Sequence, residues 1–145
     1  MQTRNDLAAI DPATDRIVQR YAMPCNHPHG FLIAEPQRLA FVSCEGDSKL
    51  LVIDLRTMRT MAAHKVAEGP DVLAFDPGLH RLYVACESGS LAMFEERDGT
   101  LTPLGEYRAP HAHTVAVDPG THRVYLPLQD VNGKPVLRIL VPPQG

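Results

Sequence analysis

Histidines that lie two residues apart are the first feature of this chain that could do chemistry. The segments His27-Pro28-His29 and His111-Ala112-His113 both have this spacing. In a β-strand, residues i and i+2 point to the same face, so each segment would present both of its imidazoles together. Acidic residues and cysteines lie in other polar segments of the chain. Imidazole, carboxylate and thiolate groups together are typical metal ligands.

The elements that must position these residues are short strands in a repeat. Three stretches, which begin at His29, Pro70 and Ala112, share one order of apolar segments and turns, with a period of about 42 residues. Each has a short apolar strand (A), a turn, an apolar strand B, a polar turn, a strand C and then, in the first two, an edge strand D. Short strands separated by turn residues predict an all-β fold. The period is that of a four-stranded antiparallel β-propeller blade, so we predict a β-propeller.

The predicted blades do not make a complete ring. We expect one half-propeller domain over residues 1–145, whose strands begin with C and D of one blade and end with A, B and C of another. About three and a half blades would leave strand edges and apolar faces in water, which favours association. We therefore expect a homodimer that closes the ring. The alternative is that the chain is the second half of a longer single-chain propeller. The expected blade parts are 5–23, 29–66, 70–107 and 112–141.

Four segments carry a resemblance to a known family. Leu50–Arg59 and Arg81–Ala85 resemble the YVTN-type β-propeller repeat. Glu96–Gly105 and His27–Gly30 resemble the lactonase-like seven-bladed propellers, a WD40-like architecture. The resemblance covers nearly the whole chain and implies that it corresponds to about half of a usual family member. It implies a fold more strongly than an activity, because such repeats serve many functions.

Propeller geometry sorts the polar residues onto two faces. The D-to-A and B-to-C connections emerge on one face, at the rim of the central channel. The residues expected to bind a ligand at this rim are His27, His29, Glu68, Asp71, His111 and His113. The wider rim also includes Cys44, Glu45, Cys86 and Glu87. Alignment of the repeats places Gly30, Asp71 and His113 in equivalent positions at the mouth of strand A. A divalent metal, if bound, is expected on His29, Asp71 and His113.

The rim allows several interpretations. Its histidines could cap the channel through hydrogen bonds and water, hold a metal, or act in catalysis. The preferred function is a binding or scaffold protein that holds a small ligand, a metal or a protein partner. A lactonase-type hydrolase is the alternative, in which a carboxylate or His would activate water against a ring ester, with a metal polarising the carbonyl. A purely structural module is the third interpretation. Whether the chain is an enzyme is left open.

Composition excludes some classes of protein. The formal net charge is -3, and no cluster of five Lys or Arg residues occurs, which disfavours nucleic-acid binding. No apolar run approaches the roughly 18 residues needed to cross a membrane. The start of the chain lacks the apolar region of a signal peptide, which predicts a cytoplasmic protein if Met1 is the native start.

The remaining cysteines and histidines are interpreted as structural. Three cysteines are a poor basis for disulfides, so reduced thiols are expected. A bond between Cys44 and Cys86 is disfavoured because equivalent positions of adjacent blades are usually too far apart. His80 and His122 lie in the A-to-B turns, on the opposite face, where we expect structural or solvated roles.

Overall fold

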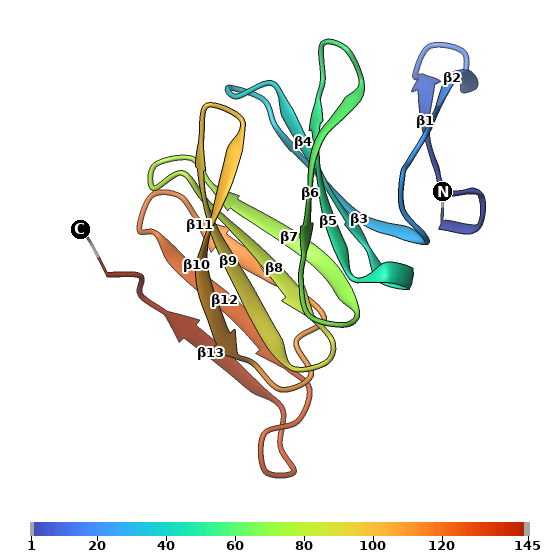
Figure 1. The fold of residues 1–145 in the computed structure, drawn as a ribbon. Coiled ribbons are helices and arrows are strands. Elements are labelled where there is room, and N and C mark those ends of the chain that lie inside the picture. Colours follow the sequence, from blue (N-terminus) through green and yellow to red (C-terminus); the bar gives the residue numbers. More distant parts are fainter. Residues whose placement is uncertain (1, 144–145) are drawn as a thin grey trace.

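The computed structural model describes residues 2–143, which form four antiparallel sheets in an open arc (Figure 1). Two strands form a half-blade, two sheets of four strands form the first and second blades, and three strands form the third blade. The described residues contain no α-helix, and none of them forms a helix long and apolar enough to span a membrane.

The half-blade has β1 (Asp6–Asp11) and β2 (Arg16–Ala22), and the first blade has β3 (Pro28–Ala34), β4 (Leu39–Cys44), β5 (Lys49–Asp54) and β6 (Arg59–Lys65). The second blade has β7 (Pro70–Asp76), β8 (Arg81–Cys86), β9 (Ser90–Arg97) and β10 (Thr100–Arg108), and the third has β11 (Ala116–Asp118), β12 (Arg123–Leu128) and β13 (Val136–Leu140). Short 3-10 turns cover Gln2–Arg4 and Glu45–Asp47.

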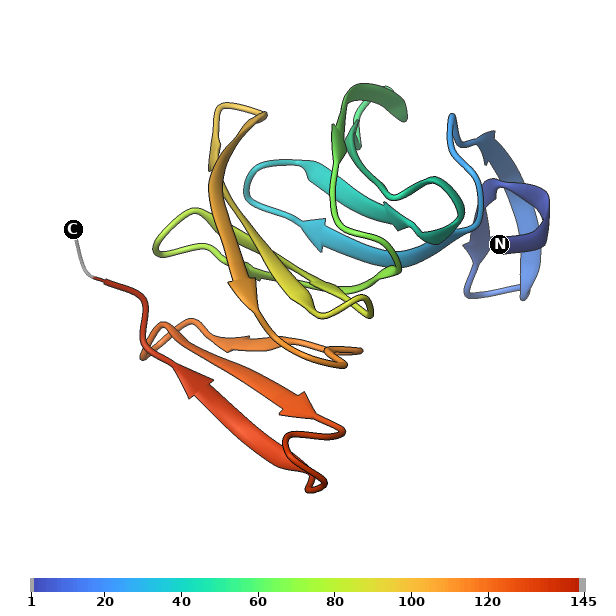
Figure 2. The same cartoon turned by 60° about the horizontal axis from the view of Figure 1, so that its bottom comes forward.

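The strand order within each sheet is that of a propeller blade. Each strand pairs with the next strand in sequence, from an inner strand A to an outer strand D. The innermost strands β3, β7 and β11 lie side by side, so the sheets fan outward from a common centre (Figure 2). The predicted all-β propeller architecture with four-stranded blades is therefore confirmed, while the third blade has strands A, B and C only.

Acidic side chains stabilise the turns between strands. The Asp54 carboxylate accepts a hydrogen bond from the backbone N–H of Arg56 at 2.8 Å, as expected for a residue that caps the C-to-D turn. Asp118 accepts one from the backbone N–H of Gly120 at 3.0 Å in the A-to-B turn of the third blade. The hydrogen bond from Arg56 favours the charged form of Asp54 and so lowers the pKa of this carboxyl. The Thr121 hydroxyl, which donates to Asp118 at 2.6 Å, and then the Gly120 N–H lower the pKa of the Asp118 carboxyl in the same way. The short turns are thus encoded locally by Asx-type hydrogen bonding.

The core lies between the blades, because each sheet is apolar on both faces. All six residues of β4 are buried, since the half-blade covers one face of this strand and the second blade covers the other. Phe41 packs against Phe75 of the second blade, with ring centroids 5.9 Å apart. Tyr83, at the matching position of β8, is 2% exposed and faces the third blade. The aromatic residues of strand B therefore pack the blades together.

The cysteines differ from the expectation of reduced thiols. Cys25 and Cys44 form a disulfide, with their Cα atoms 6.1 Å apart. Cys44 and Cys86, the pair weighed from the sequence, stand at equivalent positions of adjacent blades and are not bonded to each other. Cys25 lies in the connection between β2 and β3, which crosses the end of β4 and so brings its thiol to Cys44. Cys86 is a free, buried thiol, and burial raises its pKa to about 11. The disulfide ties the half-blade connection to the first blade.

Candidate functional site

Backbone hydrogen bonds hold the two kinds of connection together at one rim of the arc. In the first blade, the N–H of Glu45 donates to the carbonyl of His27 at 3.0 Å. In the second blade, the N–H of Glu87 donates to the carbonyl of Gly69 at 2.8 Å. The D-to-A connection therefore lies beside the B-to-C turn in both blades. This local arrangement places histidine and carboxylate side chains at the same edge of the innermost strands.

The register of the inner strands corrects one detail of the sequence alignment. Pro28 pairs with Cys44, Pro70 with Cys86, and Ala112 with Leu128. Pro28, Pro70 and Ala112 are therefore equivalent positions of the three blades. The next residue in each blade is His29, Asp71 or His113, so these three residues are equivalent as well. Gly30, which the repeat alignment placed in this set, is one residue further along β3. The error arises because the repeat alignment matched Glu35-Pro36 with Asp76-Pro77, whereas β3 ends at Ala34 and β7 ends at Asp76, so the acidic-Pro pair of the first blade lies one residue later.

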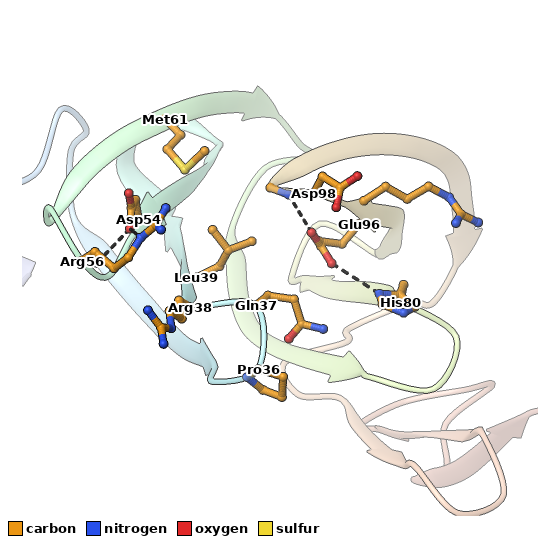
Figure 3. Close-up of a pocket in the computed structure, with 12 residues that line it drawn as sticks. Pro36, Gln37, Arg38, Leu39, Asp54, Arg56, Met61, His80, Glu96 and Asp98 are labelled. Carbon is orange, nitrogen blue, oxygen red and sulfur yellow. Dashed lines mark hydrogen bonds and ion pairs between the residues drawn. The ribbon is translucent and has the colours of Figure 1, made fainter.

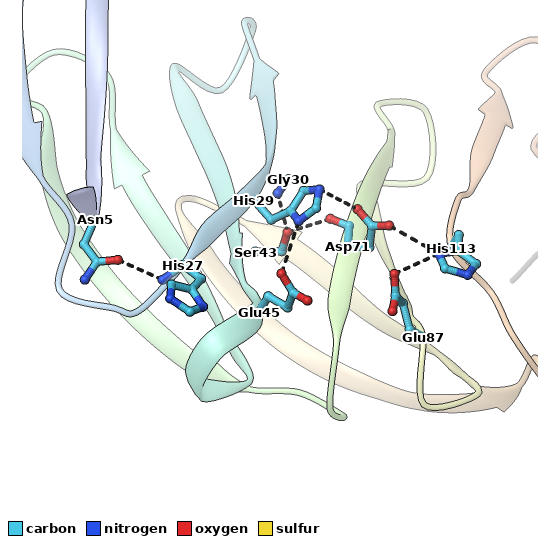
Figure 4. A network of polar contacts seen from close by, with 9 residues as sticks. All are labelled: Asn5, His27, His29, Gly30, Ser43, Glu45, Asp71, Glu87 and His113. Atoms are coloured by element: carbon cyan, nitrogen blue, oxygen red, sulfur yellow. Dashed lines mark hydrogen bonds and ion pairs between the residues drawn. The ribbon is translucent and has the colours of Figure 1, made fainter. Parts of the chain in front are cut away.

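These three equivalent residues belong to a row of alternating imidazoles and carboxylates that runs across three blades (Figure 4). Asp71 lies at its centre, with Oδ1 3.4 Å from Nε2 of His29 and Oδ2 3.9 Å from Nδ1 of His113. The other nitrogen of His29 lies 3.4 Å from Oε2 of Glu45. His113 Nδ1 lies 2.8 Å from Oε1 of Glu87. The channel mouth thus holds two imidazoles and three carboxylates in contact.

Burial differs along this row. The Asp71 side chain is 16% exposed, whereas those of His113 and Glu87 are 52% and 43% exposed. A partly buried carboxylate between two imidazoles is an anchored, oriented group, and its neighbours are free to adjust. The row therefore has a fixed centre and adaptable ends that face solvent.

Ser43 holds the centre of the row in place. Its hydroxyl donates to the backbone carbonyl of Asp71 at 2.6 Å and accepts from the N–H of Gly30 at 2.8 Å. A Cβ atom on Gly30 would overlap both the Ser43 hydroxyl and the Asp71 carbonyl oxygen, so only glycine allows β3 and β7 to approach this closely. Sequence reasoning missed Ser43. The available signal was one hydroxyl in an otherwise apolar strand B, Leu39–Cys44.

The other rim residues expected to bind ligand lie outside this row. His27 and Glu68 line a shallow depression between the first two blades, together with Glu45 and Glu87. The His27 backbone N–H donates to the side-chain oxygen of Asn5 at 2.9 Å. His111 lines a separate depression on the third blade. Of the six predicted binding residues, the structure therefore brings together His29, Asp71 and His113.

The donor atoms at the mouth have a spacing close to that of a metal site. One ligand atom from each of Asp71, Glu87 and His113 lies within 4.8 Å of the other two. Tetrahedral zinc, with ligand bonds of about 2.0–2.2 Å, needs donor separations of about 3.3–3.6 Å. Rotation of the exposed Glu87 and His113 side chains could close this difference, while Asp71 stays in place. A second group of possible ligands includes Cys25 and Cys44, but the disulfide removes their thiolates.

The opposite face of the arc has a different chemistry (Figure 3). A groove between the first and second blades is lined by Arg38, His80 and Glu96, among others. Glu96 is 2% exposed, accepts a hydrogen bond from the Gly99 N–H at 2.8 Å, and lies 3.5 Å from His80 Nδ1. The other turn histidine, His122, has its Nδ1 2.8 Å from Oδ2 of Asp76 in the second blade. Both turn histidines therefore contact carboxylates of the scaffold.

Comparisons with known proteins identify the fold. No protein-family model matches the chain, and a search of curated proteins finds no match. Among solved structures, hydrazine synthase from Kuenenia stuttgartiensis is similar over 97% of this chain, with a TM-score of 0.83 and 15% identity. The dihydro-heme d1 dehydrogenase NirN in complex with DHE matches over 97%, with a TM-score of 0.72 and 19% identity. A mitotic checkpoint complex structure matches over 92%, with a TM-score of 0.74 and 9% identity.

These similarities support a β-propeller fold and no particular activity. The identities are low, and the three proteins have different roles according to their names. This chain spans 41%, 33% and 42% of the lengths of these three structures. The YVTN-type resemblance stays an interpretation of the sequence, since no family model supports it.

Proposed function

We propose that this chain is a binding propeller whose channel mouth holds a divalent transition metal ion, to which a small ligand can then bind. The observation that carries the proposal is the position of Asp71. Its carboxylate lies between two imidazoles, and its backbone carbonyl accepts a hydrogen bond from the Ser43 hydroxyl. His113 and Glu87 supply two further donor atoms within reach of the same point. A mixed set of imidazole and carboxylate donors suits Zn²⁺ better than Ca²⁺, which prefers oxygen ligands alone.

The mouth also has the openness that a ligand-binding metal site needs. His113 and Glu87 are about half exposed, so a metal ion held there would keep positions for water or a ligand. The three residues come from the second blade and from the connection that enters the third blade. Binding a metal would therefore add a link between two blades.

Titration calorimetry with Zn²⁺ tests this proposal. We expect one Zn²⁺ to bind per chain, and His113→Ala to weaken binding by at least about tenfold, or about 1.4 kcal/mol. Asp71→Asn should have a similar effect, because it removes the central charge while keeping the side-chain shape. Ca²⁺ should bind more weakly than Zn²⁺.

His111→Ala is the matched control, because it removes an exposed imidazole two residues away that lies in another depression. It should bind Zn²⁺ like the unaltered protein. Failure of the unaltered protein to bind Zn²⁺, or equal losses in His111→Ala and His113→Ala, would contradict the proposal.

A lactonase-type hydrolase is the second candidate, and one contact favours it. His29 lies between Glu45 and Asp71, in the arrangement by which a carboxylate orients a histidine that acts as a general base. Incubation of the zinc-loaded protein with a panel of simple lactones separates the two functions. Turnover that disappears in His29→Ala supports the hydrolase, whereas ligand binding without turnover supports the binding protein.

A further inference from the structure

The arc ends in two apolar faces that residues 2–143 leave uncovered or only partly covered. On the third blade, Leu137 and Ile139 of β13 are 61% and 49% exposed. The strand pairings Pro127–Leu137 and Tyr125–Ile139 match Ala85–Leu91 and Tyr83–Met93 of the second blade. In the second blade this face is buried by the third blade, and its Leu91 is fully buried. The exposed face of the third blade therefore has the composition of a blade interface.

The other end of the arc has a partly covered face. On the first blade, the half-blade packs Leu7 and Tyr21 against the outer strands, where Leu51 is fully buried. The inner strand β3 is left uncovered, and its Phe31 and Ile33 are 47% and 53% exposed. These two residues line a groove between β3 and the half-blade. The groove lies where strands A and B of a complete blade would stand.

A polar contact between the blades shows what the two ends would offer each other. His122, the last residue of the A-to-B turn in the third blade, reaches back to the second blade, where its Nδ1 lies 2.8 Å from Oδ2 of Asp76. Asp76 is fully buried and also caps its own turn. This contact joins the acidic residue that ends strand A of one blade to the residue before strand B of the next blade.

The same two positions carry opposite charges at the free ends of the arc. Asp118 ends β11, as Asp76 ends β7, and each pairs with the first residue of the following strand B. Arg38 stands where His122 stands, directly before strand B, and both residues have a positive φ, 54° and 59°. Arg38 is exposed, and no ion pair of its guanidinium is found within residues 2–143. A first blade placed after the third blade would bring Arg38 towards Asp118.

We propose that a second copy of this chain completes the ring, with its first blade packed against the third blade of this copy and with the reverse contact at the other end. Each seam would bury Leu137 and Ile139 against an inner strand, and would pair Asp118 with the partner's Arg38. Two identical seams close a two-fold ring of six blades. One strand per chain is then in excess, because β13 and the partner's β1 both correspond to strand C of the shared blade.

The channel mouth changes in this assembly. The six inner positions would run through His29, Asp71 and His113 twice, so His113 would face the partner's His29. Gln129, which is the third-blade residue equivalent to Glu87, would lie at the same seam. The second copy therefore supplies imidazoles to the mouth that a single arc lacks.

Light scattering during size-exclusion chromatography tests the proposal on the unaltered chain. We expect a mass of about twice 15.9 kDa that does not rise further with concentration, because the ring is closed. Ile139→Lys places a charge at the centre of the seam and should give a folded monomer. Met61→Lys is its control, since Met61 is 53% exposed but lies on β6, away from both end faces.

A charge reversal tests the polar part of the seam. Arg38→Glu should raise the dimer dissociation constant about tenfold or more, because it brings a carboxylate towards Asp118. Arg59→Glu makes the same change at an exposed position of β6 and should leave the constant unaltered. A monomer at all concentrations, an assembly that grows without limit, or a dimer insensitive to Ile139→Lys would overturn the proposal. None of these outcomes depends on Zn²⁺, so they are separable from the metal titration.

Discussion

At the residue scale, the environment of a single imidazole gives the chain a dependence on pH. His64 lies on β6 with its ring 5.6 Å from that of Phe94, and its Nε2 is buried without a hydrogen-bond partner among residues 2–143. Burial disfavours the charged imidazolium, so it lowers the pKa of His64 below the usual 6.5. The folded protein thus holds His64 neutral at a pH where the unfolded chain would protonate it.

Replacement of His64 should reduce the loss of stability in acid. A group whose pKa is lowered on folding stabilises the fold above the unfolded pKa, and this contribution is lost as the pH falls through the folded value. We expect the free energy of unfolding to decrease below about pH 6.5 by more in the unaltered protein than in His64→Phe. Urea unfolding at several pH values measures this difference. An identical pH dependence in both proteins would refute the role of His64.

At the element scale, the close approach of β3 and β7 positions the candidate site. Gly30 and Ser43 together set the distance between these inner strands, and Asp71 is the residue that they hold. The equivalents of Ser43 in the other blades are Ala85 and Pro127, which lack a hydroxyl. This contact is therefore particular to the junction between the first and second blades.

Enlarging Gly30 should disturb both stability and binding. In Gly30→Ala, the new methyl group would push β3 away from the Asp71 carbonyl and the Ser43 hydroxyl, at a cost of about 1–3 kcal/mol. Zn²⁺ binding should weaken as well, because His29 and Asp71 would separate. Chemical unfolding and calorimetry measure the two effects. Gly120→Ala, in an exposed turn, is the control, and equal behaviour of both variants would contradict this explanation.

At the scale of the whole molecule, one covalent link joins the half-blade connection to the rest of the arc. Cys25 and Cys44 are both buried, and the disulfide closes a loop with a sequence separation of 19 residues. Met23 and Tyr21 of the same segment pack in the cluster that covers the first blade. The link therefore stabilises the position of the half-blade against the first blade.

Reduction should destabilise the arc. A loop of this length gives a disulfide contribution of about 3 kcal/mol in the chain-entropy model. We expect dithiothreitol to lower the urea midpoint of the unaltered protein and to have no effect on Cys25→Ser. A thiol count in the unreduced, denatured protein should find Cys86 alone. Three free thiols, or a midpoint insensitive to dithiothreitol, would show that the bond does not form.

The sequence by itself determined the class of fold, because that information is local and repeated. Short apolar strands are separated by turn residues at the same spacing in each blade. Asp54 and Asp118 belong to these turns, and each accepts a hydrogen bond from a backbone N–H only two positions away. Propeller topology then places His29 and His113 on one face, since the connections of every blade alternate between the two faces. The rim could therefore be predicted without knowledge of any contact.

Only the tertiary structure decided which rim residues meet. Contacts at the mouth depend on where each inner strand ends: Ala34 of β3 stands where Asp76 stands in β7, so the position equivalent to Asp71 is His29 and not Gly30. They also depend on Ser43, whose bond to Asp71 crosses 28 residues of sequence. The pairing of Cys25 with Cys44 arises in the same way, from a connection that crosses a strand end. Such long-range contacts follow from how the blades pack against one another. The period of the repeat contains only local information, so it does not predict them.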